Sequence, residues 1–358
     1  MSQGSLAGVL PPGSGQSREP FYSAVHDEEQ ESIACPLCGA EDERLVFLAC
    51  DTMFNQVGRY RHVACARCSM RYVNPRPTMA ALARHYPEEY LCYTNLEREH
   101  WLLKWAFARL QRDQAKRRVR QIEQVAGRIA ASTRALDVGC GRGELVASLK
   151  RHRGCDVTGL DINVAVVERV RRELAVDVHH GTLCGANYSE CSFDLLTMTE
   201  YLEHEAEPRR VIDEAWRVLK PGGILAIEVP DVSGPMGRLF GAEWWQVDAP
   251  RHLTFFSPAT LTRMLESAGF EVLKVRRYGL VMSFGYSLLQ ALGFRYFRSN
   301  KLLFLTLSTL IGIPLFPLLF MMPDFMMTVA RRRHVRVLPR PYASAPSTSS
   351  AIAAKMRA

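Results

Sequence analysis

The chain has 358 residues, 47% of them hydrophobic, which is ordinary for a globular protein and excludes a wholly disordered one. Its length leaves room for about two domains. The net charge of +8 is compatible with nucleic acid, anionic lipid or an acidic substrate as partner, and selects none of them.

Both ends of the chain are predicted to be disordered. Residues 1–30 begin with a run rich in Gly, Ser and Pro, which lacks the basic start and apolar core of a signal peptide. Residues 338–358 are rich in Pro, Ser, Thr and Ala and offer little to bury. Without an export signal, the ten cysteines indicate a reducing, cytoplasmic compartment, where paired cysteines bind metal more often than they form disulfides.

Residues 31–78 are predicted to form a zinc ribbon. The spacing C-x-x-C occurs twice, at the positions Cys35, Cys38, Cys65 and Cys68. Two such turns can present four thiolates to one tetrahedral ion, and a site closed by four protein ligands is structural. Strands are expected over 46–49 and 59–63. A rubredoxin-like iron site and buried unpaired thiols are the alternatives.

Residues 79–132 are predicted to be a helical linker. Thr78 is a suitable N-cap for a helix over 79–85. Residues 95–132 are helical in pattern and carry apolar residues on one side, namely Trp101, Leu102, Trp105 and Leu110. The second half is basic, with Lys116, Arg117, Arg118, Arg120 and Arg128. We expect these basic residues to form a solvated face, and a basic binding surface is the alternative.

A glycine-rich turn is the strongest functional signal in the chain. The run LDVGCGRGE separates an apolar strand from an apolar-periodic helix and contains Gly139, Gly141 and Gly143. Glycines let the backbone approach a ligand closely, and the start of a helix offers free N–H groups. The next strand, 157–160, ends in Asp161, whose carboxylate can accept both hydroxyls of a ribose. Together they predict a nucleoside cofactor at the carboxyl ends of parallel strands.

Further motifs follow the glycine turn in a fixed order. They are GLDIN at 159–163, SFDLLTMT at 192–199, YLEH at 201–204 and RVLKPGGILAIEVP at 217–230. In this order and spacing, the chain resembles class I S-adenosylmethionine-dependent methyltransferases. The resemblance implies a domain over 133–337 with an α/β, Rossmann-like fold: a seven-stranded, mostly parallel sheet with helices on both faces, preceded here by the small zinc ribbon.

The resemblance also implies which residues bind S-adenosylmethionine. The three glycines would surround its methionine part, Asp161 would hold the ribose, and the adenine would lie between Ile162 and the pair at 182–183. The full predicted set is Asp137, Gly139, Cys140, Gly141, Gly143, Asp161, Ile162, Thr182, Leu183 and Thr199.

The segments NPRPT and HYPEEY look like the front end of methyltransferases that modify sugars and other polar metabolites. In the sugar methyltransferases, N-terminal tyrosines help to build the substrate pocket. The candidates here are Tyr86, Tyr90 and Tyr93, which could equally be surface aromatics that pack on the main domain.

Three residues are predicted to act on the acceptor: Tyr201 and His204, which flank Glu203 beyond the fourth strand, and His252 after the fifth. Methyl transfer is an in-line displacement, so alignment and exclusion of water supply much of the catalysis. A hydroxyl or acidic carbon also needs a base, and either histidine could be that base. His204 could instead position its loop. Trp244 and Trp245 could form the floor of the substrate pocket or pack over it as a lid.

The apolar run 302–322 lies within a predicted membrane-associating insertion, 279–323, and contains no charged residue. Its length would permit a membrane span. However, residues 324–333 resemble the last strand of the methyltransferase sheet, which runs antiparallel between two others. A segment that leaves and re-enters one sheet cannot cross a membrane once. We therefore expect a hairpin that dips into the inner face of the cytoplasmic membrane, with a buried insertion or dimer contact as the alternative.

The sequence therefore predicts a methyltransferase that uses S-adenosylmethionine and acts on a small or lipid-linked polar acceptor, by analogy a sugar or glycan intermediate. An RNA methyltransferase with an RNA-binding zinc ribbon is one alternative. The apolar run and the absence of an Asn/Asp-Pro-Pro-Tyr/Phe motif disfavour it. A non-catalytic, membrane-associated scaffold is another, which the intact glycine turn and Asp161 disfavour.

Overall fold

The computed structural model describes residues 29–54, 58–86, 101–279, 281–293 and 322–336, together with Leu307 and Leu310. Several predictions fall outside these residues. They are the disordered ends over 1–28 and 338–358, the roles of Tyr90 and Tyr93, and nearly all of the apolar run 302–322.

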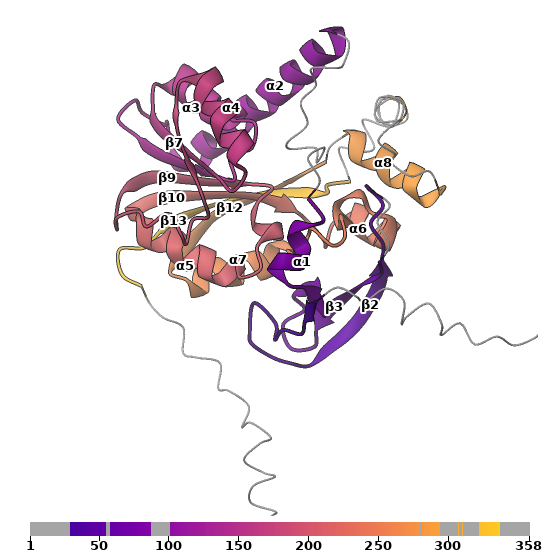
Figure 1. Ribbon diagram of the computed structural model, residues 1–358. Coiled ribbons are helices and arrows are strands. Elements are labelled where there is room, and N and C mark those ends of the chain that lie inside the picture. Colours follow the sequence, from indigo (N-terminus) through magenta and orange to yellow (C-terminus); the bar gives the residue numbers. More distant parts are fainter. Residues whose placement is uncertain are drawn as a thin grey trace, which may run out of the picture.

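Within the described residues, seven strands form one sheet in the order β12-β13-β10-β9-β6-β7-β8 (Figure 1). The strands are β6 (Arg134–Val138), β7 (Asp156–Asp161), β8 (Asp177–His180), β9 (Phe193–Thr199), β10 (Leu219–Pro230), β12 (Phe270–Tyr278) and β13 (Phe325–Arg332). Strands β6 to β10 pair in parallel, whereas β13 runs antiparallel between β10 and β12. This arrangement confirms the predicted Rossmann-like sheet and the position of its last strand.

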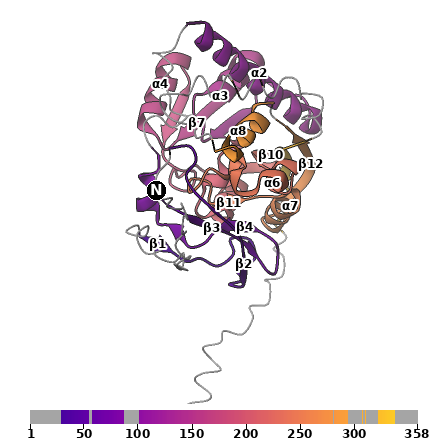
Figure 2. The same ribbon diagram turned by 90° about the vertical axis from the view of Figure 1, so that its right-hand side faces the viewer.

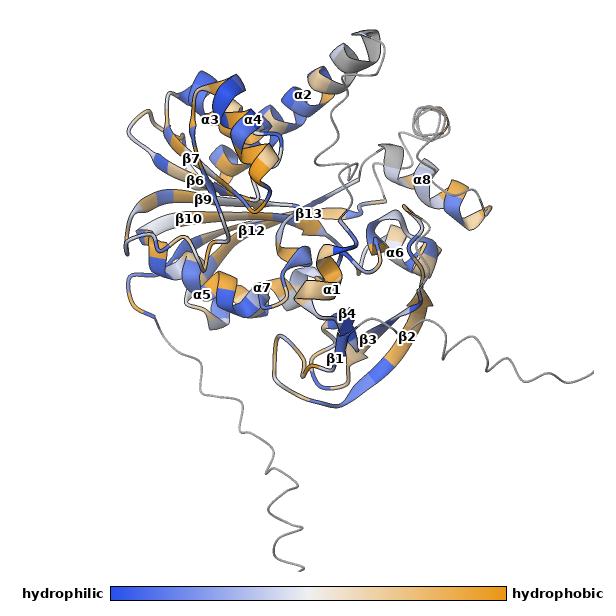
Figure 3. Cartoon of the chain, in the orientation of Figure 1, coloured by the Kyte–Doolittle hydropathy of each residue, from blue (hydrophilic) through white to orange (hydrophobic). Residues whose placement is uncertain are grey.

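Helices cover both faces of the sheet. The helices α2 (Trp101–Ala126), α3 (Glu144–Arg153) and α4 (Val164–Leu174) lie on one side, and α5 (Pro208–Val218) and α7 (Pro258–Ser267) on the other (Figure 1). Each mixes apolar and hydrophilic residues, as expected for a helix that packs one side on a sheet (Figure 3). Side chains fix where two of them begin: Asn163 accepts from the Val166 N–H of α4 at 3.1 Å, and Ser257 forms a capping box at α7.

Helix α2 differs from the expected solvated linker. Its residues Val119 and Ile122 are buried in the core on the α3 side of the sheet. Only 12% of the Arg118 side chain is exposed, and its guanidinium forms ion pairs with Glu200 and Glu228, at the ends of β9 and β10. The prediction of a solvated basic face is therefore wrong for Arg118, because it pairs with two acidic side chains at the carboxyl ends of central strands.

The cysteine-rich segment forms a second, four-stranded sheet. Its order is β11-β4-β3-β2, with β2 (Glu43–Ala49), β3 (Tyr60–Cys65), β4 (Arg71–Val73) and β11 (Thr254–Phe255). A two-stranded sheet of β1 (Gln30–Glu31) and β5 (Arg76–Pro77) adjoins α1 (Met79–Ala83), which Thr78 caps as expected. Strand β11 belongs to the methyltransferase-like part of the chain and lies beside β4 (Figure 2). The two parts therefore share a sheet as well as a core.

The chain between β12 and β13 leaves the sheet and returns to the same place, because Tyr278 lies opposite Phe325 in the two strands. Its first part, α8 (Val281–Ala291), packs on α6 (Pro235–Phe240) and on the short helices η3 (Gly241–Glu243) and η4 (Trp245–Val247). There the rings of Trp245 and Tyr286 stack at 4.1 Å. No helix among the described residues is both long and apolar enough to span a bilayer.

Candidate functional site: the glycine turn and the histidine pair

The glycine turn joins β6 to α3 and is held by the neighbouring strand. The backbone N–H groups of Gly139 and Cys140 donate to the Leu160 carbonyl of β7, at 2.8 and 3.0 Å. The φ angles of the turn glycines are positive, +70° at Gly139, +51° at Gly141 and +78° at Gly143. Other residues rarely adopt this left-handed conformation, which explains why glycine alternates through the turn.

Two of these glycines are also required by packing. A Cβ atom on Gly139 would lie 2.5 Å from the Tyr201 ring, and one on Gly143 would lie 2.7 Å from Val170 and Leu174. At Gly141 the nearest atom would be 4.0 Å away. The space for a ligand to approach this turn is therefore at Gly141, between two positions closed by protein.

Asp161 ties the end of β7 to the glycine turn. Its two carboxylate oxygens accept hydrogen bonds from the backbone N–H groups of Gly141 and Asn163, each at 2.9 Å. Burial raises the pKa of this carboxyl group. Each oxygen keeps a further lone pair, so Asp161 can hold the turn and still accept a ribose hydroxyl.

Some of the other predicted cofactor residues are buried and others are exposed. Asp137 is buried and accepts a hydrogen bond from the Thr197 hydroxyl at 2.7 Å, and burial raises its pKa to about 7. Cys140 and Leu183 are also buried. Ile162, by contrast, is 61% exposed beside Asp161, where a flat ring could lie on it. Thr182 is exposed and Thr199 is partly buried.

The structure brings His204 and His252 together, with ring centroids 4.5 Å apart. His204 ends the short helix η2 (Leu202–His204), and the carbonyl of Glu203 accepts a hydrogen bond from the Leu253 N–H at 2.8 Å. Burial lowers the pKa of His204 to about 3 and also lowers that of His252, so both rings are neutral at neutral pH. Tyr86 lies in the same place, its hydroxyl 3.1 Å from Nδ1 of His204.

The Tyr201 side chain lies on the glycine turn. Its ring covers Gly139, and its hydroxyl hydrogen-bonds the Glu205 carboxylate. It therefore borders the predicted cofactor side of the site. Of the two tryptophans, Trp244 is buried in the core and Trp245 stacks on α8.

A buried ion cluster next to the histidines was not foreseen from the sequence. Arg251 is fully buried and donates to both carboxylate oxygens of Asp51, at 2.9 and 3.0 Å, and to Asp248 at 2.6 Å. Burial alone would raise the pKa of Asp248, but the Arg251 charge lowers it to about 2. Asp51 and Arg251 are 200 positions apart, and no periodic pattern links them. The only available signal was the position of Arg251 beside His252.

The four paired cysteines converge as the spacing predicts. The sulfur atoms of Cys35 and Cys68, and those of Cys38 and Cys65, are each 3.5 Å apart, and all four lie within 4.8 Å of one another. These distances exclude disulfides, whose S–S bond is about 2.05 Å. Around a tetrahedral zinc ion the sulfur atoms would lie roughly 3.8 Å apart, given a Zn–S bond of about 2.3 Å. The cluster thus fits a zinc-ribbon module.

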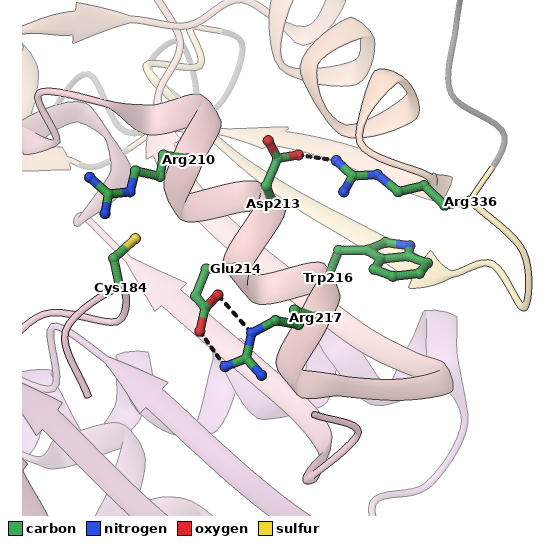
Figure 4. A pocket seen from close by; sticks show the side chains of 7 residues that line it. All are labelled: Cys184, Arg210, Asp213, Glu214, Trp216, Arg217 and Arg336. Atoms are coloured by element: carbon green, nitrogen blue, oxygen red, sulfur yellow. Dashed lines mark hydrogen bonds and ion pairs between the residues drawn. The ribbon is translucent and has the colours of Figure 1, made fainter. Parts of the chain in front are cut away.

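A separate cavity of about 330 Å³ lies along α5 (Figure 4). Its charged lining is largely paired internally, since Arg217 donates to Glu214 at 2.6 Å and Arg336 binds Asp213. It contains none of the predicted cofactor, metal or catalytic residues. We therefore place the candidate site at the glycine turn and the histidine pair.

A parallel α/β sheet with a glycine turn and an acidic residue at adjoining strand ends defines a Rossmann-like, nucleotide-binding class of protein. The family model for the methyltransferase domain matches residues 94–275, just over half of the chain. The chain belongs to this family.

Two curated relatives illustrate its range. A probable S-adenosylmethionine-dependent methyltransferase of Mycolicibacterium smegmatis is 34% identical over 161 residues, which cover 43% of this chain and 59% of the relative. A ubiquinone biosynthesis O-methyltransferase of Hahella chejuensis is 35% identical over 156 residues, covering 40% and 65%. The chain thus spans about three fifths of the length of these relatives.

Among solved structures, phosphoethanolamine N-methyltransferase 2 of Haemonchus contortus is similar with a TM-score of 0.49 and 17% identity, over 74% of this chain and 63% of that one. A putative sarcosine dimethylglycine methyltransferase of Galdieria sulphuraria is similar with a TM-score of 0.47 and 16% identity, over 62% and 86%.

Proposed function

We propose that the protein transfers a methyl group from S-adenosylmethionine to a hydroxyl of a small polar acceptor. The observation that carries this proposal is the link between Asp161 and Gly141, because it places an acidic acceptor beside the open glycine of the turn. When bound, S-adenosylmethionine would supply an electrophilic methyl group on sulfur. Asp161, the turn glycines and Ile162 would hold its ribose, methionine and adenine parts, and the other predicted cofactor residues would support them.

His252 is our first candidate for the base that takes the acceptor proton. Its Nδ1 lies 2.8 Å from the Gln246 carbonyl, which can only accept, so Nδ1 carries the hydrogen and Nε2 carries the lone pair. The His204 ring lies beside that of His252, and Tyr201 would lie on the cofactor side. Proton removal from the acceptor oxygen would accompany formation of the new C–O bond, while the methyl–sulfur bond breaks.

A hydroxyl acceptor is supported by two independent features. The relatives include enzymes named as O-methyltransferases. Tyr86, from the segment that resembles sugar methyltransferases, contacts His204, where an acceptor hydroxyl would have to lie. We propose a sugar or glycan intermediate as the acceptor, free or lipid-linked.

We further propose that the cysteine cluster of Cys35, Cys38, Cys65 and Cys68 holds structural zinc. For the apolar run 302–322 we propose peripheral contact with the inner face of the cytoplasmic membrane. The return of the chain to the same sheet edge at Tyr278 and Phe325 supports a hairpin rather than a single crossing.

The test is transfer of a labelled methyl group from S-adenosylmethionine to panels of sugar nucleotides, lipid-linked glycans, phenols and RNA. We expect label in a hydroxyl-bearing small molecule. The variant His252→Gln should lower its turnover by about 100-fold or more, the range of general-base effects, whereas the exposed control His152→Gln should not. Label found only in RNA, or in no acceptor with cofactor bound, would contradict the proposal.

A further inference from the structure

A second cluster of metal-ligating side chains lies apart from the cysteines. One carboxylate oxygen of Glu203 and one ring nitrogen each of His204 and His252 lie within 4.8 Å of one another. Glu203 and His204 come from η2 after β9, whereas His252 precedes β11. The Leu253 N–H to Glu203 carbonyl hydrogen bond holds the two segments together. The cluster is therefore built by two separate parts of the fold.

Glu203 is the most unusual member. Its relative exposure is 2%, and neither carboxylate oxygen has a hydrogen-bond partner. A buried carboxylate without a partner is strongly unfavourable, so such groups are normally paired or bound to a metal. Its acidic neighbours Glu200, Glu228 and Asp248 each pair with an arginine, whereas the Glu203 carboxylate has no hydrogen-bond partner. A bound cation would supply the missing partner.

The two histidines are oriented as metal ligands commonly are. Nδ1 of His252 lies 2.8 Å from the Gln246 carbonyl, and Nδ1 of His204 lies 3.0 Å from the Arg251 carbonyl. A bond of this kind fixes the ring and directs the lone pair of Nε2 away from the backbone, toward a metal.

We propose that Glu203, His204 and His252 bind one divalent transition-metal ion. Two imidazoles and one carboxylate suit zinc, iron, cobalt or nickel better than magnesium or calcium, which prefer oxygen ligands alone. Around such an ion the ligand atoms would lie roughly 3–3.5 Å apart, given metal–ligand bonds of about 2.0–2.2 Å, so small side-chain rotations suffice.

Three protein ligands leave a coordination position open. His204 is partly exposed, so an acceptor could reach this open position from the His204 side of the site. With a metal bound, Nε2 of His252 is a ligand and cannot act as the base. An acceptor hydroxyl bound to the metal would then lose its proton to solvent more readily, because a metal lowers the pKa of a coordinated oxygen. Metal binding itself does not depend on methyl transfer; only this use of the metal rests on the proposed function.

The test is the metal stoichiometry of the full-length protein, stripped of metal and then titrated with Co²⁺. Four thiolates give an intense sulfur-to-cobalt absorption, whereas a site of two histidines and one glutamate gives only weaker bands, so the two sites can be followed separately. We expect two equivalents in the wild type. We expect one in Glu203→Gln, a near-isosteric variant, and two in the exposed control Glu207→Gln.

A second variant, His252→Gln, should also bind one equivalent, and its control His152→Gln should bind two. One equivalent in the wild type, or two in folded Glu203→Gln, would overturn the inference. Titration of the same samples with S-adenosylhomocysteine separates the two proposals. If the wild type binds S-adenosylhomocysteine but only one metal ion, only the inferred metal site is contradicted. If it binds two metal ions but no S-adenosylhomocysteine, only the proposed function is contradicted.

Discussion

Asp51 and Arg251 form a fully buried, two-point ion pair, at 2.9 and 3.0 Å, between the cysteine-rich segment and the residue preceding His252. Asp248 binds the same guanidinium from within its own loop. The ion pair of Arg251 with Asp51 thus links the two parts of the chain. Because His252 is the next residue, this pairing also fixes the histidine side of the candidate site.

Replacing Asp51 by alanine should be strongly destabilising. The change removes one partner of a buried ion pair and leaves Arg251 with Asp248 alone, which should cost about 3–5 kcal/mol. Chemical denaturation monitored by far-UV circular dichroism measures this loss. The exposed control Asp42→Ala should change the free energy of unfolding by less than about 0.5 kcal/mol. Equal stability of the two variants would show that the pair does not hold the segments together.

Loss of the zinc proposed for the cysteine cluster should impair methyl transfer more than cofactor binding. Strand β11 pairs with β4 of the cysteine-rich sheet, with Thr254 opposite Tyr72, so disorder there would reach His252 two residues away. The glycine turn and Asp161 belong to the other sheet. For Cys65→Ser we therefore expect a lower kcat, with a Kd for S-adenosylhomocysteine within about twofold of the wild type.

The matched control is Cys155→Ser, a buried cysteine outside the cluster. It should retain the metal and the turnover of the wild type. A Cys65→Ser protein that has lost its metal yet keeps full kcat would argue against this coupling.

The sheet could be predicted from the sequence because its determinants are local. Apolar runs that end in Asp137 and Asp161, and the glycines between them, mark strand ends and turns without reference to the rest of the chain. Even the antiparallel position of β13 followed from its family resemblance. These expectations agree with the observed seven-stranded, mostly parallel sheet.

What could not be predicted depends on pairing between distant polar residues. Arg118 resembles its basic neighbours in sequence, yet its guanidinium donates to Glu228, 110 residues away. The Asp51–Arg251 pair and the entry of β11 into the cysteine-rich sheet are of the same kind. Single charged residues and a two-residue strand leave no periodic signature, so only the tertiary structure reveals them.

The carboxyl group of Asp137 should make stability fall as pH rises. Burial raises its pKa to about 7 from an ordinary value near 3.9 in the unfolded chain, so the folded state binds the extra proton between those values. Its contribution to stability is complete below pH ~4 and is lost as pH rises to about 7. Urea titrations at several pH values should show this slope in the wild type.

In Asp137→Asn, which cannot ionise and can still accept from Thr197, the slope over this range should be reduced. The exposed control Asp156→Asn should keep the slope of the wild type. A slope that is unchanged in Asp137→Asn would mean that other groups titrate in this range.

Alanine substitutions at two of the turn glycines should reduce thermal stability by different amounts. Gly139→Ala must displace the Tyr201 ring as well as strain the backbone, whereas Gly141→Ala strains the backbone alone, at about 1 kcal/mol. Thermal melting should therefore show the larger loss in Gly139→Ala. Adding Tyr201→Ala should recover part of it, since the obstructing ring is gone. Equal losses in the two single variants would contradict the close packing of Tyr201 on the turn.

Calorimetric titration with S-adenosylhomocysteine tests the central claim most directly. The wild type and Asp177→Asn, an exposed acid at the start of β8, should each bind one equivalent. Folded Asp161→Asn should bind at least about tenfold more weakly, a loss of about 1.4 kcal/mol, because it cannot accept both a ribose hydroxyl and the backbone N–H groups it now holds. Undiminished binding by Asp161→Asn, or no binding by folded, metal-loaded wild type, would contradict the assignment of this edge of the sheet as the cofactor site.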